Sequence, residues 1–312
     1  LTPEQAAAWR DTLQQLVQQG PAGAAAIRDF LQQNQDISFS GAESGLLGHA
    51  SLRQAMFSAL EQIGGPDAAN VALEILRQTA APAEIALLAQ FLDKQAPGEY
   101  REQMLAAARD ALAMASAGKL EGWDVGPLFQ IFQRYGDASA VAELAGYLPQ
   151  WKYYATMALA GMPSGEGIPA LARMATDPSA RGNRTFAWEM LAQLSTQYAD
   201  ASATLLDGAR MNTIPAAAWP TIALALGGHY QQIRTEEFDR IPVSERPQGI
   251  TTYHIASGNQ NFYRVPQAAY WPQDFVQQRL ALINQLLAMA STPQASQALQ
   301  EQQRLLSGLL QR

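Results

Sequence analysis

The stretch WKYYATMALAGMPSGEGIPALARMATDP, residues 151–178, decides the fold of this chain. Its apolar residues recur at helical spacing on both sides of a turn at Pro163, Ser164 and Gly165, which predicts two short amphipathic helices joined by a sharp break. Such a helical hairpin cannot bury its own apolar face, so copies of it must stack on one another. The stretch therefore predicts an α-solenoid.

The same plan recurs in residues 52–76, 128–148 and 153–178: an apolar helix, a turn of Gly, Pro or Asp, and a second helix with paired apolar positions. These stretches resemble the HEAT-like repeat, especially its short bacterial, PBS-lyase-type form, over roughly residues 50–210. The resemblance implies an all-α superhelix of stacked antiparallel helical hairpins. It also implies protein binding along a curved face, although a minority of the family serve in enzymes or as lyase subunits.

The copies depart from the family pattern at the turn between repeats. Arg and Asp are frequent there in the family, and in this chain only Asp67, Asp137 and Asp177 approximate them.

The chain divides into three predicted parts. Residues 1–228 follow the hairpin pattern and form the HEAT-like array, in which residues 34–48, rich in Asn, Ser and Gly, are expected to be a loop. Residues 229–272 have no sustained helical period and predict a long irregular, aromatic-rich insertion with one short β-like run, ITTYHIAS. Residues 273–312 predict a C-terminal helical hairpin that packs on the array.

Composition excludes several classes of function. Charged residues make up 16% of the chain and the net charge is −7, so the clustered Lys and Arg that nucleic-acid binding requires are missing. There is no cysteine, and the three histidines, His49, His229 and His254, do not have the spacing of a helical metal site. No phosphate-binding glycine motif occurs. We therefore expect no metal and no cofactor, and no window is apolar enough to span a membrane.

The absence of cysteine bears on location in two ways. It fits a bacterial periplasmic or otherwise extracytoplasmic protein, and it equally fits drift in a high-GC genome. The chain begins at Leu1 rather than Met, which indicates either a processed upstream signal or anchor or a trimmed sequence. We predict an extracytoplasmic bacterial protein, with the cytoplasm as the alternative.

The insertion holds the best candidate site. Tyr, Trp, Arg and Asn favour recognition because rigid amphipathic rings contact a partner at low entropic cost. The alternative is that these aromatic residues only pin the insertion across the helices. A second candidate is the group Trp151, Tyr153 and Tyr154. The predicted partner-binding residues are Tyr253, His254, Asn261, Tyr263, Arg264, Tyr270 and Trp271.

These observations predict a non-enzymatic scaffold that binds a protein or peptide through its concave face and the 229–272 insertion. The alternative is an enzyme or small-ligand-binding protein with a pocket between the insertion and the helices, centred on His254. That pocket would use Tyr253 or Tyr263 and the acids of residues 236–239. A third possibility is a structural module of a longer chain.

Overall fold

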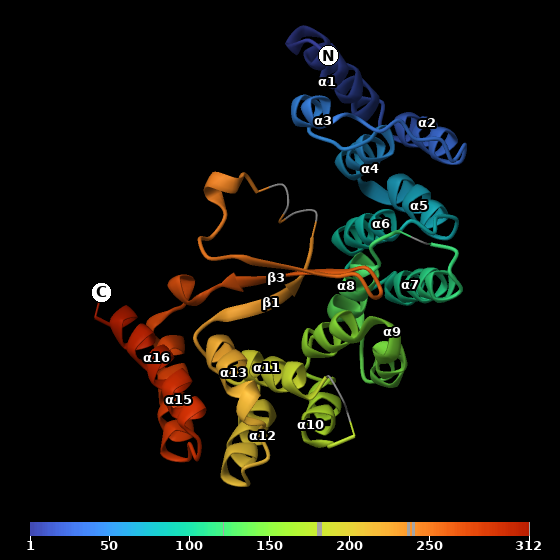
Figure 1. Ribbon diagram of the computed structural model, residues 1–312. Coiled ribbons are helices and arrows are strands. Elements are labelled where there is room, and N and C mark those ends of the chain that lie inside the picture. The colour runs from blue at the N-terminus through green and yellow to red at the C-terminus, as the bar shows by residue number, and fades with distance from the viewer. Residues whose placement is uncertain (121, 180–182, 236–237, 239–240, 312) are drawn as a thin grey trace. The chain divides into compact units, whose positions relative to one another are not determined.

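The computed structural model describes residues 1–120, 122–179, 183–235, 238 and 241–311, which form two compact units, Leu1–Trp123 and Asp124–Arg312 (Figure 1). The described residues are 67% helical and form 15 α-helices and a three-stranded sheet. The prediction of a mostly helical protein is confirmed. The all-α fold class needs a correction, because residues 229–272 contain three strands and are not irregular throughout.

The first unit consists of helices joined by short turns. Helices α4 and α5 correspond to the hairpin predicted at residues 52–76, and their alanines and leucines, such as Ala55, Leu60 and Ala72, are fully buried. The break between them lies at Gly64 and Gly65, both in the left-handed region of φ that glycine adopts without strain. The helices of this unit are α1 (Pro3–Gln18), α2 (Pro21–Leu31), α3 (Gly41–Leu47), α4 (Leu52–Ile63), α5 (Gly65–Leu76), α6 (Pro82–Gln95) and α7 (Arg101–Ser116).

Helix α3 lies within residues 34–48, where the sequence predicted a loop, so that expectation is wrong. The Ser40 side chain accepts a hydrogen bond from the Glu43 amide, and the Glu43 carboxylate accepts one from the Ser40 amide. This reciprocal capping box stabilises a helix of only seven residues.

The second unit combines helices with the sheet. Its helices are α8 (Gly126–Tyr135), α9 (Ala140–Ala160), α10 (Ile168–Thr176), α11 (Arg184–Leu194), α12 (Ala199–Arg210), α13 (Trp219–Leu226), α15 (Gln273–Ala288) and α16 (Pro293–Leu309). Its strands are β1 (His229–Ile233), β2 (Thr251–Ile255) and β3 (Gln260–Pro266), and short 3-10 turns occur at Ala216–Ala218, Val243–Glu245 and Ala268–Tyr270.

Helix α9 is bent at Trp151, whose backbone (φ −124°, ψ 53°) is not helical. The bend separates the predicted hairpin at 128–148 from the stretch at 151–178. Pro149 lies just before it and cannot donate the backbone hydrogen bond of a continuous helix. The Gln260 side-chain oxygen accepts hydrogen bonds from the amides of Tyr153 and Tyr154, and it thereby caps the second segment of α9 from strand β3.

The sheet is antiparallel with the order β1–β3–β2, so β1 and β2 are both edge strands. Its β2–β3 turn lies against the bend of α9. Gly258 in this turn has a φ of +77°, and a side chain there would come within 2.6 Å of the Gln150 carbonyl oxygen. Glycine therefore allows the turn to approach the helix closely.

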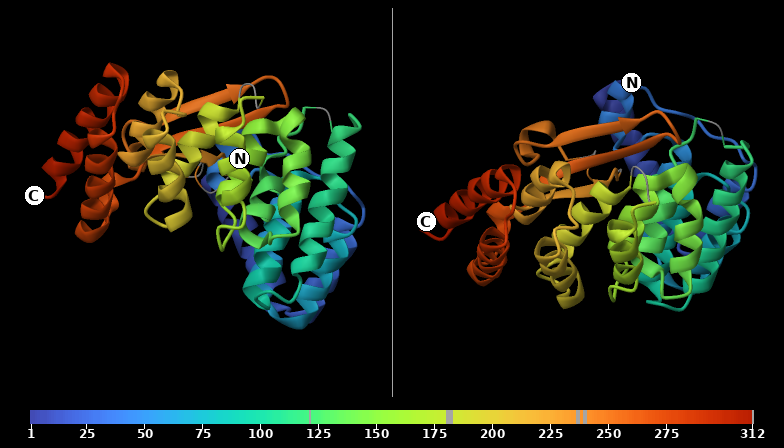
Figure 2. Two further views of the ribbon diagram at one scale, coloured as in Figure 1. Left: turned by 90° about the horizontal axis from the view of Figure 1, so that it is seen from below. Right: turned by 60° about the horizontal axis from the view of Figure 1, so that its bottom comes forward.

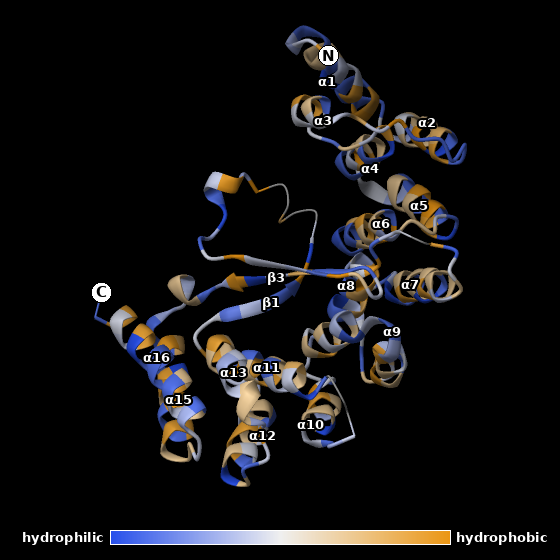
Figure 3. Cartoon of the chain, viewed as in Figure 1, coloured by the Kyte–Doolittle hydropathy of each residue, from blue (hydrophilic) through white to orange (hydrophobic). Residues whose placement is uncertain are grey.

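Helices α11 and α13 lie between the sheet and the helices α10 and α12 (Figures 1 and 2). Strand β1 is the strand next to these helices, although most of its residues are hydrophilic (Figure 3). Its sequence, HYQQI, was not expected to pair. Hydrogen bonds to α11 and α15, described below, explain how it packs against the helices.

Candidate functional site: the edges and polar contacts of the sheet

The predicted site residues do not form one cluster. Tyr253 and His254 lie on β2, and Asn261, Tyr263 and Arg264 lie on β3, where His254 is directly opposite Asn261. Tyr263 is buried, with its ring centre 4.8 Å from that of Phe238. The remaining two, Tyr270 and Trp271, follow the sheet. The structure therefore brings five of the seven together on one hairpin, and their side chains point to different faces.

His254 is at the exposed end of a polar chain that leads into the unit. One of its ring nitrogens, Nδ1, is 2.7 Å from Asn261 Oδ1, and Asn261 Nδ2 donates to Asp124 at 3.2 Å. Because the Asn261 side chain directs its N–H₂ at Asp124, its oxygen is the acceptor toward His254, and His254 Nδ1–H donates this hydrogen bond. His254 itself is exposed.

The Tyr154 side chain is the buried end of this series of hydrogen bonds. Its hydroxyl lies 2.6 Å from Asp124 Oδ1 and 3.1 Å from the Asn261 carbonyl, and it also accepts a hydrogen bond from the Asn261 amide. Burial, with the nearby Asp124 carboxylate as a further cause, raises the pKa of the Tyr154 hydroxyl well above its usual value. The hydroxyl therefore stays protonated and holds β3 in place as a neutral hydrogen-bonding group.

A second polar group lies under the sheet. Arg264 Nη2 is 2.9 Å from Glu189 Oε1, and Gln231 Nε2 donates to the same oxygen at 2.9 Å. Glu189 is only 3% exposed, and this burial raises the pKa of its carboxyl, although Gln231 and Arg264 oppose the shift. The Arg264 guanidinium also lies 5.4 Å from the ring centre of Tyr253, so it links β2 to this buried pair.

Trp271 packs beside a buried cation. Its ring centre is 4.9 Å from that of Phe275. The guanidinium carbon of Arg279 lies 5.6 Å from the centre of each of these two rings. Tyr270, in contrast, is 71% exposed. Trp271 therefore has a packing role in this structure, and Tyr270 is the more accessible of the two.

Arg279 is completely buried and, among the described residues, no carboxylate pairs with it. Its guanidinium donates to the carbonyls of Ala192 and Gln193 at the end of α11, the latter at 2.6 Å, and to Ser195 Oγ at 2.7 Å. It also donates to the Tyr230 hydroxyl at 2.8 Å. The negative end of the helix dipole and the aromatic rings thus take the place of a counterion.

Neither Glu189 nor Arg279 was predicted from the sequence as a functional or structural residue. The sequence does contain an indication of both. Arg279 lies between Val276 and Ile283 on the apolar face of α15, and Glu189 lies within a run of buried residues of α11. A charged residue at an apolar position of a helix indicates a buried partner, but the sequence cannot say which partner.

The two edges of the sheet differ in their free backbone groups. The backbone amide of Arg234, the residue after β1, donates to the Asn261 carbonyl at 3.1 Å. Asn261 therefore directs its backbone groups toward β1. Successive residues of an antiparallel strand direct these groups to opposite sides, so Phe262 directs them toward Tyr253 of β2. On β2, Thr252 and His254 therefore direct their N–H and C=O groups away from the sheet, and the side chains of both are exposed.

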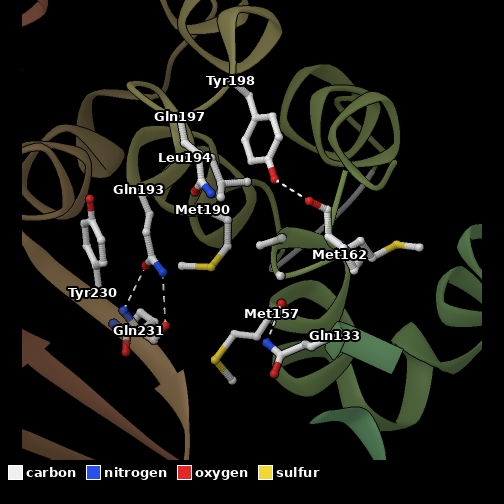
Figure 4. A pocket seen from close by; sticks show the side chains of 13 residues that line it. Gln133, Met157, Met162, Met190, Gln193, Leu194, Gln197, Tyr198, Tyr230 and Gln231 are labelled. Carbon is white, nitrogen blue, oxygen red and sulfur yellow. Dashed lines mark hydrogen bonds between the residues drawn. The ribbon is translucent and has the colours of Figure 1, made fainter. Parts of the chain in front are cut away.

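The outer edge of β1 is occupied. The Gln193 side chain accepts a hydrogen bond from the Gln231 amide at 2.9 Å and donates to the Gln231 carbonyl at 3.3 Å. A pocket of about 280 Å³ lies beside this contact, between β1, α9 and α11 (Figure 4). Its lining includes the methionines Met157, Met162 and Met190 and no charged residue. The pocket is between the 229–272 segment and the helices, as the alternative hypothesis required, but His254 does not line it.

The other expected groups give no further site. The acids Glu236, Glu237 and Asp239, which were candidates for acid–base chemistry, lie outside the described residues. Among the residues that are described, no three His, Asp or Glu side chains gather as metal ligands would. No helix in the same part of the chain combines the length and apolar character that crossing a bilayer requires.

Comparison of the chain with protein-family models, with curated proteins and with solved structures gives no match.

Proposed function

We propose that this protein binds proteins or peptides, and that an extended segment of the partner pairs with strand β2. The observation that carries the proposal is the open edge of β2, where Thr252 and His254 direct backbone N–H and C=O groups outward. Strand addition at such an edge supplies main-chain hydrogen bonds without requiring a deep cavity.

The side chains along β2 favour the same function. Residues 250–255 carry no Asp, Glu, Lys or Arg, and edge strands that avoid pairing commonly carry such charges, a proline or a bulge. Tyr253 is supported from below by Phe262, with ring centres 5.0 Å apart and ring planes at 11°. A rigid, half-buried aromatic residue next to exposed Thr252 and His254 provides side-chain contacts for a bound segment.

The alternative, an enzyme or small-ligand binder centred on His254, has less support. The His254 ring is exposed, its hydrogen-bond partner is an amide rather than a carboxylate, and His254 does not line the pocket at β1. A histidine that serves as a general base is commonly oriented by a carboxylate at its other ring nitrogen. The HEAT-like scaffold with a concave binding face and the extracytoplasmic location remain predictions from the sequence.

Proline at position 252 tests the proposal. The Thr252 amide faces away from β3, so Thr252→Pro removes an outward donor without removing a hydrogen bond of the sheet. Peptides would be selected from a random display library on the wild-type chain and then titrated against Thr252→Pro and against Thr252→Val, which keeps the amide. We expect about tenfold weaker binding for Thr252→Pro and wild-type binding for Thr252→Val.

Two outcomes would contradict the proposal. One is a selection that yields no peptide with reproducible affinity for the wild-type chain. The other is a selected peptide that binds Thr252→Pro as tightly as the wild type while circular dichroism shows that both variants are folded.

A further inference from the structure

The Gln193 side chain occupies the position that a strand residue would take beside β1. A carboxamide carries the same N–H and C=O groups as a peptide bond, and Gln193 uses both of them on the two backbone groups of Gln231. A residue of an added antiparallel strand would make the same two contacts in a hydrogen-bonded pair. The outer edge of β1 is thus closed by a side chain that imitates a one-residue strand.

The pocket next to Gln193 has the properties of a side-chain site. Met157, Met162 and Met190 are buried and give it an adaptable apolar wall, because the thioether side chain has several accessible rotamers. At about 280 Å³ it lies just below the range of roughly 300–1,000 Å³ that is usual for ligand pockets. It is suited to one side chain rather than to a large cofactor.

Two polar side chains at the pocket already donate hydrogen bonds to backbone carbonyls, and this favours an uncharged ligand. Gln133 Nε2 donates to the Met157 carbonyl at 2.8 Å, and the Tyr198 hydroxyl donates to the Pro163 carbonyl at 3.1 Å, as Figure 4 shows. No lysine, arginine, aspartate or glutamate lines the pocket, so a charged group would enter it without a counterion.

A residue that pairs with the outer edge of β1 would direct its side chain toward the pocket. Residues that are paired across an antiparallel ladder direct their side chains to the same face. The Gln231 side chain points to the helices, where it donates to Glu189 on α11. The side chain of a residue bound opposite Gln231 would therefore point to the helices as well, on the side where Met190 and the rest of the pocket wall lie.

We propose that β1 is a second peptide-binding edge, separate from β2, and that Gln193 keeps it closed until a segment with an uncharged apolar residue, such as Leu, Met or Phe, displaces it. The bound residue pairs with the backbone of Gln231 and inserts its side chain into the methionine-lined pocket. Because Ile233 packs against α8 near Gly126, the accessible edge is short, and the contact involves one residue of the partner rather than a long strand.

Short capped peptides test this proposal on the full chain. The probes are acetylated and amidated pentapeptides Thr-Ser-X-Ser-Thr, in which X is Leu, Met, Phe, Ala or Glu, and their affinities are measured by calorimetry. We expect X = Leu, Met or Phe to bind more tightly than X = Ala or Glu. Gln193→Ala should raise the affinity for the apolar probes by about threefold to tenfold, because two neutral hydrogen bonds no longer have to be broken.

A blocking variant and its control distinguish the pocket from the rest of the surface. Gln197 is an exposed residue at the pocket, so Gln197→Trp can cover the mouth without disturbing the core. It should weaken apolar-probe binding by about tenfold. Gln297→Trp, a matched change at an exposed site on α16, should leave binding unchanged.

Three results would overturn the proposal. They are no binding of any probe to the wild type or to Gln193→Ala, equal binding of the Leu and Ala probes, and self-association of Gln193→Ala in place of probe binding, as seen by analytical ultracentrifugation. The last result would mean that Gln193 only protects the edge against a second copy.

Discussion

The two edges of one small sheet are treated in opposite ways. Strand β1 is held by side chains from two helices: Gln193 and Glu189 on α11 contact Gln231, and Arg279 on α15 contacts Tyr230. Strand β2 has Tyr253 stacked on its neighbour Phe262, and its exposed residues Thr252 and His254 direct their backbone groups away from β3. The difference teaches that a hydrophilic strand can pack against helices when buried polar groups satisfy it, whereas an uncharged strand rich in β-branched residues can remain on the surface.

The largest expected effect is at Arg279. Arg279→Met keeps the volume and removes the donors to Ala192, Gln193, Ser195 and Tyr230, so carbonyls at the end of α11 lose their buried partner. We expect a loss of about 3–5 kcal/mol in the free energy of unfolding, measured by urea denaturation followed by circular dichroism. Arg279→Lys should recover only part of this loss, because an ammonium cannot reach all of these acceptors. A loss below about 1 kcal/mol for Arg279→Met would show that β1 does not depend on this anchor.

Glu189 should have the next largest effect. Glu189→Ala leaves Arg264 and Gln231 without their shared buried acceptor, which is expected to cost about 3 kcal/mol in unfolding free energy. The measurement is the same denaturation experiment. A value as small as that of an exposed residue would remove Glu189 from the set of β1 anchors.

Glu189 also predicts a pH dependence with a definite sign. Burial raises the pKa of its carboxyl in the folded state above the ordinary value of 4.5. The folded state therefore binds the proton more tightly than the unfolded chain does. The stability that this proton binding contributes is present in full below pH 4.5 and decreases as the pH rises through the folded-state pKa. Glu189→Gln cannot titrate. The unfolding free energy of the wild type minus that of Glu189→Gln should therefore fall as the pH rises from 4.5 toward neutrality, and a rising difference would contradict the assignment.

Tyr154 tests how β3 is held between the two edges. Tyr154→Phe keeps the ring but leaves the Asn261 amide and the Asp124 carboxylate without the hydroxyl. We expect a loss of about 1–2 kcal/mol in stability and faster hydrogen exchange of the Asn261 amide, measured by NMR. Unchanged exchange at Asn261 would mean that the ladder to β1 is sufficient to protect this amide.

The smallest expected effect is at His254. His254→Ala removes an exposed side chain whose partner is Asn261, and its effect on the unfolding free energy should stay within about 0.5 kcal/mol. The comparison of the edges would fail if His254→Ala destabilised the chain as much as Glu189→Ala.

Much of the helical structure was predictable from local patterns. The break at Gly64 and Gly65 separates α4 from α5, and the kink at Trp151 falls between two predicted hairpins. Helix α3 was missed although its capping box, Ser40 followed three residues later by Glu43, is visible in the sequence. Strand β1 had no comparable signal, because His, Tyr and Gln at alternating positions do not produce an apolar period.

The candidate site was predicted only in part. The cluster of aromatic and polar residues at 250–271 was recognised, and Tyr253, His254, Asn261 and Arg264 do lie on one hairpin. Their partners were not foreseen: Asp124 lies 137 residues from Asn261, and Glu189 lies 75 residues from Arg264. Local periodicity carries no information about such pairs.

The sequence by itself determined that the chain is mostly helical and where its helices break, because helix periodicity, proline and glycine act over a few residues. Tertiary structure alone decided that a side chain occupies the outer edge of β1, and that Thr252 and His254 on β2 direct their backbone groups away from the sheet. Gln193 and Gln231 are 38 residues apart, and Tyr154 and Asn261 are 107 apart, so their hydrogen bonds exist only after the helices have packed. A buried polar group must find a partner, and the folded arrangement, not the local pattern, determines which partner it finds.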